Sequence, residues 1–269
     1  MMSRPSELRN RFRSGAVSGL TAGMAPGWQQ ANIAIVPKQH ADDFEGFLRA
    51  NPEACPLLAR GRAGDPFLPE LGAGIDLRRD LPKYRVSYHG HIAAEPSDIT
   101  CFWRDDLVAF AIGCSLSFES ALAAEGVALR SHAPGASCAA FDSTLPAVAT
   151  GPFATKLVLT MRAVPHKDLA KVISITSRYP QAHGAPIHVG TPEEIGVDLA
   201  SPIDGIGVTD IRTDEVPVFW ACGVTMERAL ARASLDLAIT HAPGHMLITD
   251  LPVEAEPWPA GKESQQCSG

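Results

Sequence analysis

Four of the nine histidines of this chain stand as two pairs in short segments that are broken by proline and glycine. His183 and His188 bracket the sequence Gly-Ala-Pro-Ile, and His241 and His245 bracket Ala-Pro-Gly. Imidazole is the side chain whose unperturbed pKa lies in the physiological range, so it serves in proton transfer and in metal binding. Each pair lies beside an apolar run typical of a strand, and loops at strand ends commonly carry catalytic groups. We therefore predict that these histidines belong to one active site.

The second pair lies between two strand-like runs, residues 237–241 and 246–250, that are joined only by Ala-Pro-Gly. If the runs form a tight hairpin, His241 and His245 face each other across its open end, with Cβ atoms about 4.5–5.5 Å apart. Two imidazoles at that spacing could hold one metal ion or one carboxylate. In the alternative interpretation, the histidines only cap exposed backbone groups of the turn. The metal site is less favoured, because the chain offers no third ligand at a diagnostic spacing.

A second candidate segment, residues 113–119, combines a glycine, a cysteine and two serines at the expected start of a helix. Backbone N–H groups at a helix start bind anions, so we assign Cys114, Ser115 and Ser117 to substrate binding. Glu119 would lie in the first helical turn, where a carboxylate can act as a general acid or base. In the plainer interpretation, Ser117 is the N-cap of the helix and Cys114 is a small buried residue.

Three more residues complete the candidate substrate-binding set. Cys222 and Thr225 follow an apolar run and precede an expected helix, which is where ligands collect in open α/β sheets. Burial is the simpler explanation for Cys222. Arg104 could hold a carboxylate through two parallel hydrogen bonds, although the surrounding Trp-Arg-Asp-Asp is more typical of a solvated helix face.

The composition limits the classes of protein to which the chain can belong. Of its 269 residues, 45% are hydrophobic and 20% are charged, which is ordinary for a globular protein. The net charge of −7 argues against nucleic acid as a main partner, because binding to phosphates needs basic residues. No apolar run approaches the roughly 20 residues that span a bilayer. The first residues lack the apolar core of a secretory signal, and the six cysteines contain no C-x-x-C pair. We therefore expect a cytoplasmic protein with reduced thiols that contacts neither membrane nor nucleic acid.

Hydrophobic spacing and breaking residues predict alternating helices and strands around these groups. Helices are expected near residues 5–15, 41–51, 98–112, 117–126, 165–176 and 225–235. Strands are expected near residues 31–36, 157–161, 186–189, 216–222, 237–241 and 246–250, with a hairpin at 84–94. The stretch 60–83 is rich in Gly, Pro, Asp and Arg and is predicted to be a long surface loop, which is uncommon unless it is functional.

This alternation favours an α/β fold in which a mixed sheet is flanked by helices. The composition changes at residues 131–156, which are small and polar without a regular hydrophobic pattern. It changes again at residues 190–215, which are rich in Gly and Asp. The two stretches bracket a strand and helix pattern, as the borders of an insertion would. We predict a discontinuous main α/β domain of residues 1–130 and 215–269, with a smaller inserted α+β subdomain of residues 131–214.

Six blocks of the sequence, taken in order, resemble the hydro-lyase family that is grouped with D-glutamate cyclase-like proteins. They extend from about Met24 to Leu251 and read MAPGWQQANIAIVP, DLPKYRV, WRDDLVAFAIGCSLSFE, HGAPIHVG, EVPVFWACGVT and ITHAPGHMLITDL. The resemblance implies an α/β fold with two subdomains and a lyase of amino-acid metabolism that removes water from a small carboxylic acid. Closure of D-glutamate to 5-oxo-D-proline is the candidate reaction. The resemblance assigns no role to individual residues.

Lactam formation from glutamate needs a base that frees the amine, an acid that protonates the departing hydroxide, and donors that hold two carboxylates. We assign proton transfer to Glu119, His188, His241 and His245, and substrate binding to Arg104, Cys114, Ser115, Ser117, His183, Cys222 and Thr225. A small anionic substrate is the expected partner, no cofactor or metal is expected, and the chain could form a homo-oligomer. The alternatives are a metal-dependent hydratase or hydrolase that uses the histidines as ligands, and a non-catalytic small-acid binding protein.

Overall fold

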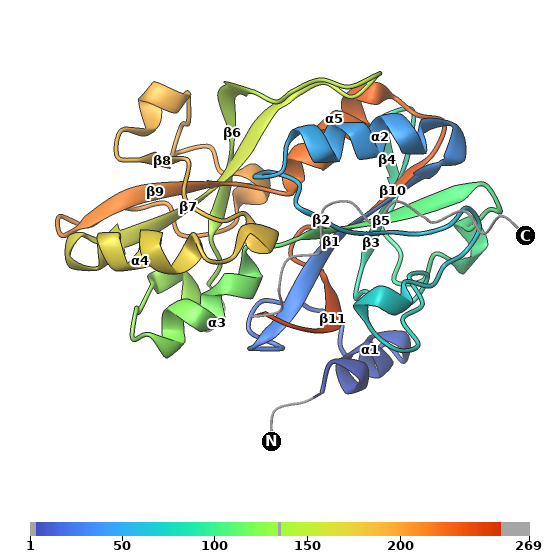
Figure 1. Ribbon diagram of the computed structural model, residues 1–269, viewed down its shortest axis with the longest axis horizontal. Coiled ribbons are helices and arrows are strands. Elements are labelled where there is room, and N and C mark those ends of the chain that lie inside the picture. The colour runs from blue at the N-terminus through green and yellow to red at the C-terminus, as the bar shows by residue number, and fades with distance from the viewer. Residues whose placement is uncertain (1–3, 134–135, 254–269) are drawn as a thin grey trace, which may run out of the picture.

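A computed structural model describes residues 4–133 and 136–253 of the chain, which form two sheets (Figure 1). The larger sheet contains β1 (Trp28–Pro37), β2 (Leu57–Arg60), β3 (Tyr84–Tyr88), β4 (His91–Ala94), β5 (Leu107–Gly113), β10 (Ala238–His241) and β11 (Leu247–Pro252). The smaller sheet contains β6 (Ala139–Pro146), β7 (Lys156–Pro165), β8 (His188–Val189) and β9 (Glu215–Ala221). The predicted α/β fold class and the predicted hairpin, β3–β4, are confirmed.

The paired strands of both sheets are antiparallel within the described residues, whereas the sequence pattern predicts a mixed sheet. Strand direction depends on spatial neighbours, and β1 lies between β5 on one edge and β10 and β11 on the other. These strands are far apart in the sequence, so the order of local elements does not set their direction.

The described residues contain five α-helices, which cover the two sheets from different sides. They are α1 (Pro5–Arg13), α2 (Lys38–Ala50), α3 (Leu116–Ala124), α4 (Leu169–Thr176) and α5 (Val224–Ala233). In Figure 1, α2 and α5 lie over the larger sheet, α1 lies at its opposite side, and α3 and α4 lie beside the smaller sheet. Short 3₁₀ helices occupy Pro69–Leu71, Thr100–Phe102, Arg130–His132, His166–Asp168, Pro180–Ala182, Pro192–Ile195 and Ile203–Gly205. None of the described helices is both long and apolar enough to cross a membrane.

The larger sheet is buried on both faces by different means. One face packs against α2 and α5, where Phe44 and Met226 contact the apolar side chains of β1 and β5. The predicted long loop, residues 60–83, covers the other face with Leu68, Leu71 and other fully buried residues. A loop therefore takes the place of a helical layer, which explains its length.

The predicted helix over residues 98–112 is wrong, because β5 occupies Leu107–Gly113. Asp98 accepts a hydrogen bond from the Thr100 N–H at 2.8 Å, and only a 3₁₀ turn follows. Alternate β5 side chains enter the two opposite hydrophobic clusters, so both faces of the strand are buried. A strand that is buried on both faces lacks the alternation of apolar and polar residues that marks a half-exposed strand. Its continuous apolar run cannot be distinguished from a buried helix by periodicity alone.

The predicted hairpin over residues 237–250 is also wrong, because β10 and β11 both pair with β1. Thr240 lies opposite Ala34, and Leu247 lies opposite Ala31, so the two segments follow one edge of β1 in the same direction. They are the halves of one interrupted strand, and the interruption lies opposite the middle of β1. The His241 Nδ1 atom approaches the backbone there, at 3.3 Å from both the N and the O atoms of Ile33.

The smaller sheet extends beyond the predicted insertion. Strands β6, β7 and β8 lie within residues 131–214, but β9 follows that segment and pairs with β7 from Glu215 to Ala221. Its core is formed by strand residues together with α3 and α4, which pack near Trp220. The division of the chain into two domains stays a prediction from the sequence.

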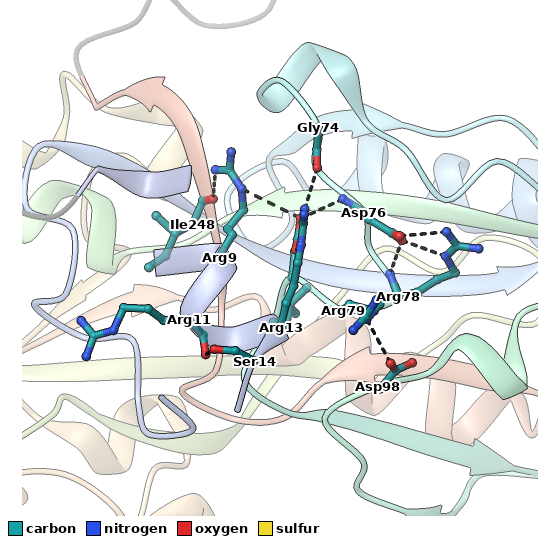
Figure 2. Close-up of polar contacts among 12 residues, drawn as sticks. Arg9, Arg11, Arg13, Ser14, Gly74, Asp76, Arg78, Arg79, Asp98 and Ile248 are labelled. Atoms are coloured by element: carbon teal, nitrogen blue, oxygen red, sulfur yellow. Dashed lines mark hydrogen bonds and ion pairs between the residues drawn. The ribbon is translucent and has the colours of Figure 1, made fainter. Parts of the chain in front are cut away.

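Helix α1 is held to the larger sheet by arginine contacts (Figure 2). The Arg9 guanidinium is buried, and its Nη1 donates to the Ile248 O at 2.9 Å and to the Asp250 Oδ1 at 2.8 Å. Arg13 pairs with the buried Asp80 of the long loop. The same helix directs Arg11 away from these partners (Figure 2).

We expect Arg9→Gln to lower the free energy of unfolding by about 3 kcal/mol, because it leaves the Asp250 carboxylate and a buried carbonyl oxygen without their cationic partner. Arg11→Gln on the exposed side of the same helix is the matched control, and its effect should stay within about 0.5 kcal/mol. Urea denaturation of the two variants measures the difference. Equal stability of the two variants would mean that Arg9 does not hold α1.

Candidate active site

A cavity of about 560 Å³ lies where the two sheets meet. Its wall includes Asn32, Arg85 and Thr240 from the larger sheet and Ala140 and Thr160 from the smaller sheet. The volume falls within the range of small-molecule binding sites in proteins. We therefore take this cavity as the candidate active site.

Two strand-to-helix turns present their first helical residues to the cavity. Strand β5 continues through Cys114 and Ser115 into α3, and β9 continues through Cys222 and Gly223 into α5, and these four residues line the wall. The first amides of a helix have no carbonyl partner within the helix, and the helix dipole adds positive potential there. Each turn is therefore suited to an anionic group.

The two turns share one local design. Cys-Ser-Leu-Ser-Phe-Glu at residues 114–119 corresponds position by position to Cys-Gly-Val-Thr-Met-Glu at residues 222–227. The Ser117 Oγ accepts from the Gln30 N–H at 3.0 Å and donates to the Gln30 O at 3.4 Å. The Thr225 Oγ1 bonds in the same way to the backbone of Val158, at 2.9 and 3.5 Å. Both hydroxyls thus fasten a helix start to the neighbouring strand, and neither residue lines the cavity.

The repeated motif ends on a glutamate in each copy, and the two glutamates have different surroundings. Glu119 does not line this cavity, and its Oε1 accepts from the Arg162 Nη2 at 2.7 Å. Glu227 lines the cavity, where its Oε1 lies 3.6 Å from the His241 Nε2. Burial raises the pKa of Glu227 to about 7, with Arg85 opposing the rise and Asp204 adding to it.

Two of the predicted histidines line the cavity, and both are buried. Burial lowers the pKa of His241 to about 4, against the opposing effect of its hydrogen bond to Ile33. Burial also lowers the pKa of His183 to about 4, although its Nδ1 lies 2.8 Å from the Glu53 O. Both imidazoles are therefore neutral near pH 7, the form that accepts a proton.

Three other predicted residues lie away from the cavity wall. The His188 Nε2 lies 2.9 Å from the Thr191 O, and the His245 Nδ1 lies 2.8 Å from the Pro243 O. Arg104 is exposed, and it pairs with two acidic residues on the surface. Each histidine pair therefore contributes only one member to the cavity.

The cavity thiols are protonated near neutral pH. Burial raises the pKa of Cys222 to about 12, and burial also raises the pKa of Cys114 well above its usual range. A thiol in that state does not favour nucleophilic attack or metal binding, since both need the thiolate. Among residues 4–133 and 136–253, no group of three or more His, Cys, Asp or Glu side chains is placed to hold a metal ion.

Most residues of the cavity wall were not predicted from the sequence, and Glu227 and Thr160 are the two on which the proposals below depend. Glu227 is one of several charges in an ordinary helical pattern, and Thr160 lies inside an apolar strand. The match between residues 114–119 and 222–227 is the signal that could have identified Glu227, because Glu119 was already a candidate. No comparable signal marks Thr160.

Comparison with known proteins relates the chain to one family. The model of the D-glutamate cyclase family matches residues 108–250. A protein of Afipia carboxidovorans is 47% identical over 92% of this chain and 91% of its own length, and one of Paraburkholderia phytofirmans is 50% identical over 92% and 96%, respectively. Both bear the name "Putative hydro-lyase". A solved structure of a nitrogen repressor-like protein from Methanococcus jannaschii covers 88% of this chain with a TM-score of 0.38 and 10% identity.

The pKa of His183 is about 6.5 in the unfolded chain and about 4 in the folded protein. As the pH falls from 6.5 towards 4, the unfolded chain gains a proton that the folded protein does not bind. The folded protein therefore has its full stability above pH 6.5 and loses stability over this range. We expect His183→Asn to remove about 3 kcal/mol of this pH dependence between pH 7 and pH 4. Asparagine tolerates the left-handed backbone of position 183 (φ 77°) and can donate to the Glu53 O.

Urea unfolding at several pH values measures this slope. His91→Asn changes an exposed histidine of β4 and is the control, which should keep the slope of the native protein. An unchanged slope in His183→Asn would contradict the burial of a neutral imidazole at this position.

Proposed function

Because the chain belongs to the D-glutamate cyclase family, we propose that it is a hydro-lyase that closes D-glutamate to 5-oxo-D-proline with loss of one water. The family match and the two relatives confirm the resemblance to this family that the sequence blocks indicate. The observation that carries the proposal is the 3.6 Å approach of the Glu227 Oε1 to the His241 Nε2 in the wall of a cavity that is also lined by two helix starts.

The reaction joins the amine nitrogen of the substrate to the carbon of its distal carboxyl group. One oxygen of that carboxyl group departs as water. In the ammonium and carboxylate form of glutamate, the nitrogen loses two protons and the departing oxygen gains two, so the balance needs no oxidant or reductant. The site must take protons from nitrogen and deliver protons to oxygen.

Glu227 and His241 fit these two tasks. A carboxyl group with a pKa of about 7 is partly protonated at neutral pH, so Glu227 can donate to the departing oxygen. His241 is neutral, and contact of its Nδ1 with the backbone of Ile33 directs its Nε2 towards Glu227. The imidazole takes a proton from the amine, and the 3.6 Å separation lets a small movement return it to Glu227.

The two helix starts support the choice of an acid with two carboxylates. The turns at Cys114–Ser115 and at Cys222–Gly223 face the same cavity, and each offers backbone N–H donors. Glutamate carries one carboxylate that reacts and one that does not, so it can use both turns at once. A monocarboxylic acid would leave one of them unoccupied.

We expect Glu227→Gln to reduce the rate of 5-oxo-D-proline formation by roughly 100-fold or more, the usual contribution of a positioned acid. Glu193→Gln on the exposed surface is the matched control and should keep the native rate. Chromatography of the product from D-glutamate measures the rate, and thermal unfolding checks that both variants are folded. Native activity in Glu227→Gln would contradict the proposed acid.

The same assay separates the alternatives. Activity that is lost after dialysis against a chelator and restored by a metal ion would favour a metal-dependent hydratase or hydrolase. Stabilisation of the protein by D-glutamate without any product would favour a binding protein, since a bound ligand raises apparent stability without turnover.

If Glu227 is the acid, the rate should fall about tenfold per pH unit as the pH rises above its pKa. Asp204→Asn removes a negative charge that raises this pKa, so the fall should begin at lower pH. Arg85→Gln removes a positive charge that lowers the pKa, and the fall should begin at higher pH. The pH dependence of kcat for the two variants measures the displacement. Displacements in the same direction would contradict the assignment.

A further inference from the structure

The two helix starts are alike in sequence, but the groups that surround them differ. The α5 turn is followed by Glu227, which approaches His241 and provides the proposed proton transfer. The α3 turn has Arg162 beside it instead, and Glu119 is paired with that arginine. The groups proposed for proton transfer therefore lie beside the start of α5. The start of α3 has no assigned role in proton transfer and could bind a different part of the substrate.

Arg162 is held rigidly behind the α3 turn. Its guanidinium lies 4.8 Å from the Phe118 ring centre and 5.3 Å from that of Trp220, and the residue is 1% exposed. Its Nη2 donates to the Ser115 Oγ at 3.1 Å, while its Nε and Nη1 have no hydrogen-bond partner among the described residues. Buried donors without a partner cost free energy, so they call for a ligand or another explanation.

The contact with Arg162 determines how Ser115 can act. A serine hydroxyl has one hydrogen to donate and lone pairs that accept. Because the Ser115 Oγ accepts from Arg162, its hydrogen is available for another group, and Ser115 lines the cavity. Arg162 is therefore a positioning residue that prepares a serine donor at the helix start.

Thr160 adds a second donor on the same side. It precedes Arg162 by two residues on β7, so the two side chains share one face of the strand. Thr160 lines the cavity and is 5% exposed, and its Oγ1 has no hydrogen-bond partner in residues 4–133 and 136–253. The Asn32 side chain in the same wall differs, because its Nδ2 donates to the Gly113 O at 2.7 Å.

We propose that the start of α3, together with Ser115 and Thr160, forms the subsite for the carboxylate that the reaction does not consume, and that Thr160 determines specificity for it. The donors of this subsite match a carboxylate, which only accepts hydrogen bonds. The orientation rests on the proposed function, because the carboxylate that reacts must lie beside Glu227 and His241. The other carboxylate of the substrate then reaches the α3 side.

The test uses two ligands that each lack one feature of D-glutamate. The product, 5-oxo-D-proline, retains only the carboxylate that is not consumed, whereas 4-aminobutyrate retains the amine and the other carboxylate. In calorimetric titrations, Thr160→Val should weaken binding of 5-oxo-D-proline about tenfold, the effect of a lost hydrogen bond to a charged group. Binding of 4-aminobutyrate should change by less than twofold. Thr213→Val, on the exposed surface, is the matched control.

Kinetics and stability give independent results for the same variant. Thr160→Val should raise KM for D-glutamate about tenfold and leave kcat within about twofold, because the lost bond holds a group that does not react. Its melting temperature should equal or exceed that of the native protein, since valine replaces an unpaired buried hydroxyl with a methyl group of similar size.

The outcomes separate this proposal from the proposed function. Selective loss of 5-oxo-D-proline binding in a protein that forms no lactam would support the subsite and overturn the lactam-forming reaction. Native KM and native product binding in an active Thr160→Val would overturn the subsite alone. A native protein that binds 4-aminobutyrate but not 5-oxo-D-proline would also overturn the subsite.

Discussion

The central strand β1 is the part of the structure on which the candidate site depends. One of its edges pairs with β5 from Ala31 to Pro37, and the other is divided between β10 and β11. Backbone polar groups in a buried sheet must find partners. Where the second edge is interrupted, the imidazole of His241 approaches the backbone of Ile33. Pro243 and Gly244 of the same interruption line the cavity, and the Nε2 atom of the ring lies 3.6 Å from the Glu227 Oε1.

Burial then shifts the pKa values of the proposed acid and the proposed base through a single physical effect. Removal from water disfavours the charged form of each group, so the pKa of Glu227 rises and the pKa of His241 falls. The neutral imidazole and the protonated form of the carboxyl group avoid the high cost of an isolated ion in the protein interior. The two groups line one cavity, and the proposed function assigns proton donation to the carboxyl group and proton acceptance to the neutral imidazole.

The repeated strand–cysteine–helix turn shows how one local design can serve two purposes. Its hydroxyl, Ser117 in one copy and Thr225 in the other, has the same backbone contacts in both. The glutamates differ because their neighbours come from elsewhere in the chain. Arg162 pairs with Glu119, whereas Glu227 has a neutral imidazole beside it and burial raises its pKa to about 7.

The sequence by itself determined the elements whose signals are local. The spacing of Ala41, Phe44 and Phe47 marks one side of α2, and the two strands around His-Gly-His form the hairpin β3–β4. The six sequence blocks likewise determined the family. The strand pattern before Cys222 and the helix pattern after Gly223 place Cys222 at a helix start, and the break at Gly113 places Cys114 and Ser115 at another, although the strand before Gly113 was predicted as a helix.

Only the tertiary structure decided which of these residues meet. Whether the run 107–113 is a strand depends on its burial between β1 and β2, and the course of residues 237–250 depends on the free edge of β1. Arg162 reaches Ser115 only because β7 lies beside the start of α3, which is more than 40 residues earlier in the chain, and Thr160 lines the same cavity as Ser115. Sequence spacing records neighbours along the chain, whereas burial, pKa and hydrogen-bond partners depend on neighbours in space.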